Sequence, residues 1–419
     1  MIPIPLSIKG FFSPGPNTSL YISFWVFGLT NNILYVVILS AAIDIVGPNV
    51  PKSVVLLVDI LPSLLFKLAS PFFIHKVKYK YRIVSLILLS VVGMILVSSD
   101  VVNICLFGVV LASLSSGFGE VTFLQLTHTY KEVALNGWSS GTGGAGLLGS
   151  GIYMFLTTIL GVSIRSSLLL FSVFPFSFLL YFKLNPQEEY TAFERDIQDH
   201  LLDDVGQCNN SVAGQLHQPP DHELTFESIY KTLGDIKRLI IPYMLPLTTV
   251  YFFEYLINQA VAPTLLFPIE RSTPIKRSFF EFENYRDYYV TYGTLYQIGV
   301  FISRSTASIF RIKHLYALSI LQGANFAITV IQSCKYFTSN PLPIMLLVLY
   351  EGLLGGSSYV NTFLNVLEDL PPEETEAALG TVTIADSLGV LFAALVGILL
   401  EPALCQYQVN HGREWCTLG

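Results

Sequence analysis

The sequence predicts an all-α protein that crosses a membrane many times, and three observations support this fold class. Of the 419 residues, 52% are hydrophobic and only 13% are charged, whereas soluble domains are about 25% charged. The mean hydropathy is +0.57. The apolar residues come in runs of about 20, long enough at 1.5 Å per residue to cross a hydrocarbon layer of roughly 30 Å. Such a chain has too few polar residues to cover a water-facing surface.

Hydropathy places about six of these spans in the first half of the chain, which predicts an N-terminal six-helix bundle over residues 20–184. The short segment 1–19 before it lacks the basic and apolar regions of a signal peptide and is expected to be cytosolic. The expected spans are residues 20–42, 53–75, 82–98, 101–127, 139–161 and 165–184.

The second half contains about five more runs, so the predicted total is about 11 transmembrane helices in two bundles. The C-terminal bundle covers residues 239–401, and a tail follows at 402–419. The expected spans are residues 239–267, 289–310, 314–334, 342–367 and 378–401. Aromatic residues near the expected ends of spans predict an interfacial belt, and these are Trp138, Tyr288, Tyr289 and Tyr292.

The stretch between the two bundles, residues 185–238, is expected to be an acidic linker. It carries eleven Asp and Glu residues against four Lys and Arg residues, and the whole chain has a formal net charge of −7. The acidity therefore belongs to this linker and not to the spans. High charge with few apolar residues predicts that the linker is disordered.

Lys and Arg in short loops predict which side each loop occupies, because such loops stay on the cytosolic side. The densest basic segment is His75-Lys-Val-Lys-Tyr-Lys-Tyr-Arg82. Counting spans outward from it places residues 1–19, the acidic linker and Arg311-Ile-Lys313 in the cytosol. The tail 402–419 then lies in the lumen, where Cys405 and Cys416 are candidates for a disulfide.

Composition and motifs argue against several other functions. No region is basic enough to bind nucleic acid, and the five cysteines show neither C-x-x-C nor zinc spacing. The chain lacks H-E-x-x-H and a phosphate loop with Lys, and it has no arrangement typical of a Ser, His and Asp triad. We therefore expect no metal, no cofactor and no enzymatic activity.

One glycine motif needs an explanation, because Gly141-Thr-Gly-Gly-Ala-Gly146 matches G-x-G-x-x-G. A dinucleotide site requires a strand before this motif, and here the motif opens an apolar span instead. Small residues four apart allow membrane helices to approach closely. Gly141, Gly143, Gly144 and Gly146 therefore predict close helix packing or a helix break.

Ionisable residues inside the spans are the strongest functional signal, since a charge at the bilayer centre costs about 2.5 to 3.5 kcal/mol on insertion scales. Lys67 and Asp59 lie two turns apart, so a structural ion pair between them is one alternative, and Arg304 has the alternative of extending to the cytosolic edge. The candidate residues of the substrate or proton pathway are Glu120, Glu254, Glu351, Arg304, Asp386, Asp59 and Lys67.

Glu120, Glu254 and Glu351 are the carboxylates favoured for binding a cation or protons, with Arg304 balancing their charge. Small residues surround Glu120 and Glu351, in Ser115-Ser-Gly-Phe-Gly119 and Gly352-Leu-Leu-Gly-Gly356, and such neighbours leave room for substrate or water. Partial desolvation of a carboxylate favours its proton-binding form.

Several long segments resemble the battenin family. They are Ser115-Ser-Gly-Phe-Gly-Glu-Val-Thr-Phe-Leu124, Trp138-Ser-Ser-Gly-Thr-Gly-Gly-Ala-Gly146, Glu254-Tyr-Leu-Ile-Asn-Gln259, Gly299-Val-Phe-Ile-Ser-Arg-Ser305, Tyr350-Glu-Gly-Leu-Leu-Gly-Gly356, Tyr359-Val-Asn-Thr-Phe363 and Ile384-Ala-Asp-Ser-Leu-Gly389. The resemblance covers nearly the whole chain except the acidic linker, and it is closest to the fungal members of the family.

This resemblance implies a fold related to the major facilitator and equilibrative nucleoside transporters. It also implies the vacuolar (lysosome-like) membrane as the location, with roles in vacuolar pH homeostasis and in the transport of arginine or another basic amino acid, together with protons. Two alternatives stay open. One is an exporter of glycerophosphodiesters, and the other is a non-transporting regulator of vacuolar trafficking and pH whose 185–238 linker recruits trafficking proteins.

Overall fold

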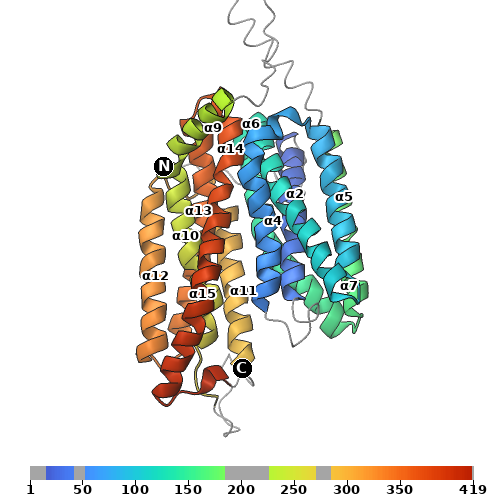
Figure 1. Ribbon diagram of the computed structural model, residues 1–419. Coiled ribbons are helices and arrows are strands. Elements are labelled where there is room, and N and C mark those ends of the chain that lie inside the picture. The colour runs from blue at the N-terminus through green and yellow to red at the C-terminus, as the bar shows by residue number, and fades with distance from the viewer. Residues whose placement is uncertain (1–15, 42–51, 185–225, 270–284, 418–419) are drawn as a thin grey trace, which may run out of the picture.

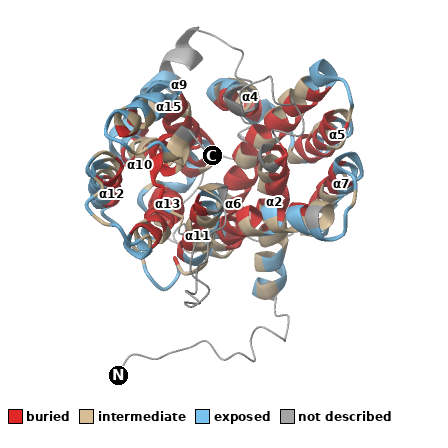
Figure 2. Cartoon of the chain, turned by 90° about the horizontal axis from the view of Figure 1, so that it is seen from below, coloured by how far each residue is buried: buried red, intermediate tan, exposed pale blue. Residues whose placement is uncertain are grey.

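The described residues form two bundles of helices that lie side by side (Figure 1, Figure 2). The computed structural model describes residues 16–41, 52–184, 226–269 and 285–417. The first bundle contains α2 (Pro16–Ser40), α4 (Lys52–Phe73), α5 (Tyr79–Val97), α6 (Val102–Met154), α7 (Ile164–Phe171) and the 3₁₀ helix Phe174–Lys183. The second contains α9 (Phe226–Leu239), α10 (Leu245–Leu256), α11 (Tyr285–Ser305), α12 (Leu315–Lys335), α13 (Leu342–Asp369), α14 (Pro372–Val382) and α15 (Ile384–Asn410).

The helix α6 folds back on itself and crosses the membrane twice. Its backbone leaves the helical conformation at Lys131, with φ 56° and ψ −148°. The rings of Phe123 and Trp138 lie 5.4 Å apart, whereas fifteen residues of straight helix would separate them by about 22 Å. The two arms of α6 therefore form a helical hairpin, as the predicted break between residues 127 and 139 requires.

The number of membrane passes agrees with the prediction within the described residues. Nine segments there are long and apolar enough to cross a membrane. One of them is the α6 hairpin, which supplies two passes, and the more polar α11 packs lengthwise against α13 in the second bundle. The nine segments, the second pass of the hairpin and α11 together give the eleven passes that hydropathy predicts.

Two predicted boundaries differ from the structure. The end of the predicted acidic linker is the helix α9 (Phe226–Leu239), where Phe226, Ile229, Tyr230, Leu233 and Ile236 recur at helical spacing. The last span is longer than expected, because α15 continues to Asn410 within the predicted tail. The rest of the linker, residues 185–225, lies outside the described residues.

Contacts between loops show which segments share one end of the bundles. Tyr79, in the basic segment 75–82, donates a hydrogen bond to Glu376 of α14 at 2.7 Å. Arg311 forms an ion pair of 3.0 Å with Glu368, just before α14 begins. The two basic segments predicted to be cytosolic therefore lie at the same end of the bundles, where α9 and α14 appear in Figure 1. Residues 1–15, also predicted to be cytosolic, lie outside the described residues.

The tail forms a compact structure at the opposite end of the second bundle. A disulfide joins Cys405 and Cys416, the two cysteines that the sequence marks as a candidate pair. Arg413 donates a hydrogen bond of 2.6 Å to the carbonyl of Cys334, and Trp415 packs against Tyr336. These contacts fix the tail against the end of α12.

The glycine motif lies in an unbroken stretch of α6. At this motif α6 packs closely against both α2 and α11. A Cβ atom at Gly141 would overlap the main-chain carbonyl of Trp25. One at Gly143 would lie 3.2 Å from the Cα atom of Phe301, and one at Gly146 would overlap the Gln297 amide. At Gly144 the nearest atom would be 3.5 Å away, an ordinary contact. The motif thus allows close packing, and the helix does not break there.

This packing predicts different results for two alanine substitutions in one motif. Gly141→Ala forces α2 and α6 apart and is expected to destabilise the protein by about 1–3 kcal/mol. Gly144→Ala, the matched control, should leave stability within about 0.5 kcal/mol of the wild type. Denaturant unfolding of the purified protein in detergent measures both, and equal stability of the two variants would contradict the packing role.

Candidate functional site

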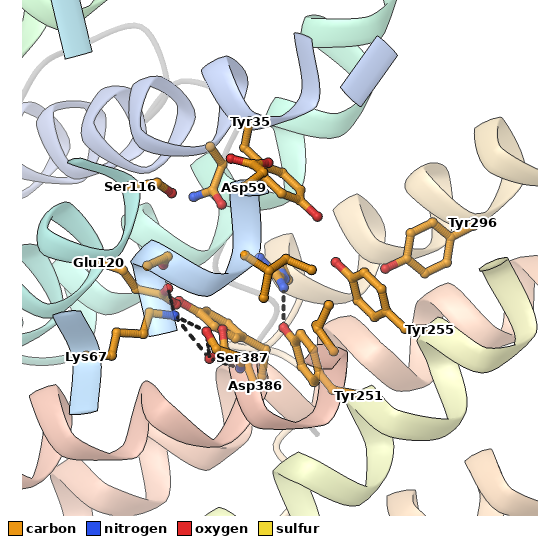
Figure 3. A pocket seen from close by; sticks show the side chains of 16 residues that line it. Tyr35, Asp59, Lys67, Ser116, Glu120, Tyr251, Tyr255, Tyr296, Asp386 and Ser387 are labelled. Carbon is orange, nitrogen blue, oxygen red and sulfur yellow. Dashed lines mark hydrogen bonds and ion pairs between the residues drawn. The ribbon is translucent and has the colours of Figure 1, made fainter. Parts of the chain in front are cut away.

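A cavity lies between the two bundles, and both bundles contribute side chains to it (Figure 3). Its volume is about 130 Å³, enough for several water molecules or part of a small solute. The first bundle contributes residues of α2, α4 and α6, and the second contributes residues of α10, α11, α13 and α15. The lining residues are Asn32, Tyr35, Asp59, Ile60, Ser63, Lys67, Ser116, Glu120, Tyr251, Tyr255, Tyr296, Arg304, Tyr359, Asp386, Ser387 and Val390.

Lys67 is the centre of an ionic cluster that joins the bundles. Its Nζ atom lies 2.6 Å from Glu120 Oε2 and 3.2 Å from Asp386 Oδ1, and it donates a hydrogen bond of 2.7 Å to Ser387. The Lys67 residue is only 2% exposed, so the two carboxylates compensate a charge that would otherwise be costly to bury. The alternative pair between Lys67 and Asp59 does not form.

A chain of hydrogen bonds continues from this cluster across the bundle interface. The Tyr359 hydroxyl donates to Glu120 Oε1 at 2.9 Å and accepts from Trp138 Nε1 at 3.1 Å. Trp138 is completely buried, so the prediction that it anchors the interface is wrong. Tyr288 and Tyr292 are buried too, at 4% and 1% exposure, and of the four predicted belt residues only Tyr289 is exposed.

Arg304 lies against the cavity and does not extend to the cytosolic edge. Its guanidinium donates to Thr142 Oγ1 at 2.6 Å and to the Tyr251 hydroxyl at 2.9 Å. It also stacks over the Tyr359 ring, 4.1 Å from the ring centre, a favourable cation–π geometry. The Nε atom of Arg304 is buried and has no hydrogen-bond partner in the part of the chain that the structure describes.

Asp59 is the unpaired carboxylate of the cavity. The residue is 3% exposed, and its Oδ2 atom is buried without a partner among the described residues. The nearby Ser113 hydroxyl donates to the Asp59 main-chain carbonyl and not to its carboxylate. An unpaired buried anion is expensive, so either a proton or a cationic ligand would stabilise this carboxylate.

Tyrosines form much of the cavity wall, and sequence reasoning missed them. The five are Tyr35, Tyr251, Tyr255, Tyr296 and Tyr359. Tyr35 in α2 and Tyr255 in α10 line the cavity from opposite bundles (Figure 3). A sequence signal was present in Tyr251 and Tyr255, which are one helical turn apart on either side of the predicted residue Glu254.

Two of the predicted pathway carboxylates do not line this cavity. Glu254 and Glu351 lie within the second bundle, at 2% and 0% exposure. The small residue Gly355 leaves room for the Glu254 carboxylate itself, because a Cβ atom there would overlap it. Of the predicted site residues, the cavity thus unites Asp59, Lys67, Glu120, Arg304 and Asp386.

These features define a class of protein. Two helical bundles that enclose a cavity lined by charged and polar side chains are the architecture of a solute transporter. Among the described residues, no group of three or more His, Cys, Asp or Glu side chains is arranged to hold a metal ion.

Solved structures share this architecture. A bacterial homologue of the iron transporter ferroportin, in an outward-facing state, aligns with a TM-score of 0.55 and 12% identity over 97% of this chain and 96% of its own. The human organic anion transporter MFSD10 (TETRAN) aligns with a TM-score of 0.54 and 14% identity, covering 96% of each chain. At such identities the likeness concerns the fold alone, and it agrees with the expected major facilitator architecture.

Sequence comparison then identifies the family. The family model described as CLN3 protein matches residues 22–407. Protein BTN1 of Saccharomyces cerevisiae is 56% identical over 406 residues, covering 95% of this chain and 98% of the relative. Protein BTN1 of Candida glabrata is 55% identical over 413 residues, with coverage of 95% and 98%. The chain belongs to the CLN3, or battenin, family, and it is a transporter-like, multi-pass membrane protein.

Proposed function

We propose that this protein carries basic amino acids, arginine first among them, across the vacuolar membrane and thereby contributes to vacuolar pH homeostasis. The observation that carries the proposal is the Asp59 carboxylate, which lines the cavity and pairs with no cationic side chain among the described residues. The location and the arginine substrate rest on the resemblance to fungal battenins, and the fold points to a transporter more than to an enzyme.

The chemistry of the cavity suits a guanidinium group. A carboxylate accepts strong, charge-assisted hydrogen bonds from a guanidinium, and Asp59 Oδ2 has no hydrogen-bond partner among the described residues. Tyrosine faces attract the same cation, and Tyr35, Tyr255 and Tyr296 line the cavity together with Asp59. The side chain of arginine therefore has a complementary surface.

The other end of an amino acid also has a partner. The buried Nε–H donor of Arg304 has no acceptor within the described residues, and a carboxylate is an acceptor whose geometry matches a guanidinium. Lys67 is less suited to this task, since Glu120 and Asp386 already neutralise it. A bound basic amino acid would thus satisfy both Asp59 and Arg304.

Reconstituted protein provides the test. Proteoliposomes with an acidic interior are supplied from outside with radiolabelled arginine, lysine, leucine or glycerophosphocholine. We expect uptake of arginine and lysine, and uptake of leucine at the level of empty vesicles. Equal uptake of leucine and arginine would contradict the role of Asp59, because leucine lacks the cationic group.

The glycerophosphodiester alternative also has an observation in its favour, namely the free donor of Arg304, which would suit a phosphate. It leaves the Asp59 carboxylate unpaired, however, and brings a second anion near it. The same panel separates the two functions, since uptake of glycerophosphocholine without arginine would favour the diester. A non-transporting regulator predicts no uptake of any of these solutes.

A further inference from the structure

We propose that Glu254 and Glu351 form a proton-binding site inside the second bundle, separate from the cavity and connected to it through Tyr296. Proton binding by this pair is independent of the identity of the substrate. Only its coupling to transport rests on the proposed function.

The Glu254 carboxylate is held by α11 and α13. Its Oε1 atom accepts a hydrogen bond from the hydroxyl of Tyr296, which itself lines the cavity. The carboxylate lies against Gly355, where any side chain would overlap it. Its Oε2 atom is buried and has no hydrogen-bond partner among the described residues. One oxygen is therefore free to carry a proton.

Glu351 lies one turn before Gly355 and has the same arrangement. Its Oε1 atom accepts a hydrogen bond of 2.7 Å from Asn258 Nδ2, and Asn258 is one turn after Glu254, to whose carbonyl it also donates at 3.2 Å. The Oε2 atom of Glu351 is buried without a partner among the described residues. Asn258 thus links the Glu351 carboxylate to the main chain at Glu254, and each of the two acids has an oxygen without a partner among the described residues.

A third polar side chain at this level is also unsatisfied. Gln322 of α12 is completely buried, and neither its amide nitrogen nor its amide oxygen has a partner among the described residues. Asn325 donates to the carbonyl of Leu347 in α13. The two helices are antiparallel, so one turn back from Asn325 on α12 corresponds to one turn forward from Leu347 on α13. Gln322 therefore lies about level with Glu351. A protonated carboxyl offers both a donor and an acceptor to such an amide.

The charges around the pair do not neutralise it. The positive charge of Arg304 interacts electrostatically with Glu254. However, Arg304 lies two turns beyond Tyr296 on α11, and its guanidinium donates hydrogen bonds to Thr142 and Tyr251. The nearest titratable group facing Glu351 is Glu254 itself. The described titratable groups of α12 lie only near its ends. The titratable groups that interact electrostatically with Glu254 are Arg304, Tyr296, Tyr251 and Tyr255. Asp386 of α15 in turn interacts with Tyr251 and Tyr255.

These surroundings favour at least one bound proton. Two neighbouring carboxylates repel each other when both are ionised, and burial without a cation adds a desolvation cost. A proton on one acid removes both costs and satisfies a free oxygen. The pair therefore titrates as one coupled unit and not as two independent acids.

Tyr296 connects this unit to the cavity. A basic substrate near Asp59 brings positive charge to the wall that Tyr296 forms, and positive charge stabilises the ionised form of Glu254. Substrate binding then releases the proton, and protonation releases the substrate. This reciprocity is the condition for exchange of protons against a cation, the direction in which an acidic vacuole would accumulate basic amino acids.

Infrared difference spectroscopy of the purified protein in lipid bilayers tests proton binding without any substrate. We expect a carbonyl band of protonated carboxyl groups that persists above roughly pH 5, where exposed carboxyls are ionised. Glu254→Gln and Glu351→Gln should each weaken this band, and the double variant should remove the part of the band that these two acids contribute. The control Asp100→Asn, an exposed acid, should leave the band unchanged.

A further variant allows the same test if the glutamine variants fold poorly. Tyr296→Phe removes the donor to Glu254 but both acids remain, so the band should persist at a shifted frequency. A wild-type protein without the band above pH 5, or a band that neither Tyr296→Phe nor the double variant affects, would overturn the proposal.

The coupling has its own readout. Glu254→Gln is expected to abolish arginine uptake driven by a proton gradient and to retain exchange of arginine against arginine across the membrane. If gradient-driven uptake by Glu254→Gln equals that of the wild type, the coupling is refuted. If the wild type transports no arginine, the proposed function fails, whereas the infrared result still decides whether the site binds protons.

Discussion

Replacing Lys67 with methionine is expected to destabilise the protein by about 3–5 kcal/mol, because it leaves two buried carboxylates without their cation. Glu120 and Asp386 lie 2.6 Å and 3.2 Å from the Lys67 ammonium. They come from different bundles, so their mutual repulsion would also separate the two halves. Denaturant unfolding in detergent, followed by tryptophan fluorescence, measures the loss.

Two further variants show whether charge is the cause. The triple variant Lys67→Met, Glu120→Gln, Asp386→Asn removes all three charges and should recover most of the lost stability, since a neutral cluster needs no buried cation. Arg165→Met breaks the exposed pair of Arg165 and Asp100, whose side chains are 61% and 83% exposed, and should cost no more than about 1 kcal/mol. If Lys67→Met costs no more than Arg165→Met, the cluster does not hold the bundles together.

The sequence predicts the spans well because each span is a local property. A run of apolar residues must be helical at membrane depth, where only internal hydrogen bonds satisfy the backbone. The α6 hairpin is a good example, since polar residues around Lys131 interrupt two apolar runs. The helix α9 was missed because its apolar residues are spaced by helical turns and are diluted by charges.

The partners of the charged residues are not local, and the sequence could not assign them. Lys67 has Asp59 two turns away, yet it pairs with Asp386, 319 residues distant. The choice depends on which faces of α4 and α15 meet, and that depends on the packing of two bundles. The same argument applies to Glu351, where small neighbours suggest an open site although Gly355 accommodates the carboxylate of another helix.

Asp59→Asn is expected to abolish high-affinity arginine binding and to leave the fold intact. Loss of one partner from a buried, hydrogen-bonded charge pair costs about 2 kcal/mol or more, which corresponds to an affinity about 30-fold weaker or worse. Asparagine has nearly the shape of aspartate, so the cavity keeps its form. Equilibrium binding of radiolabelled arginine to the purified protein measures the effect, and Asp100→Asn is the matched control with expected wild-type affinity.

The stability of the same variant separates this role from a structural one. In the absence of substrate, the Asp59 carboxylate is buried without a partner among the described residues, so its neutralisation should leave the free energy of unfolding unchanged or raise it. A residue that held the fold together would behave in the opposite way. Functional sites often contain groups that lower the stability of the unliganded protein because they are placed to bind a ligand. An Asp59→Asn protein that unfolds more easily yet binds arginine normally would show that the carboxylate serves the fold and not the substrate.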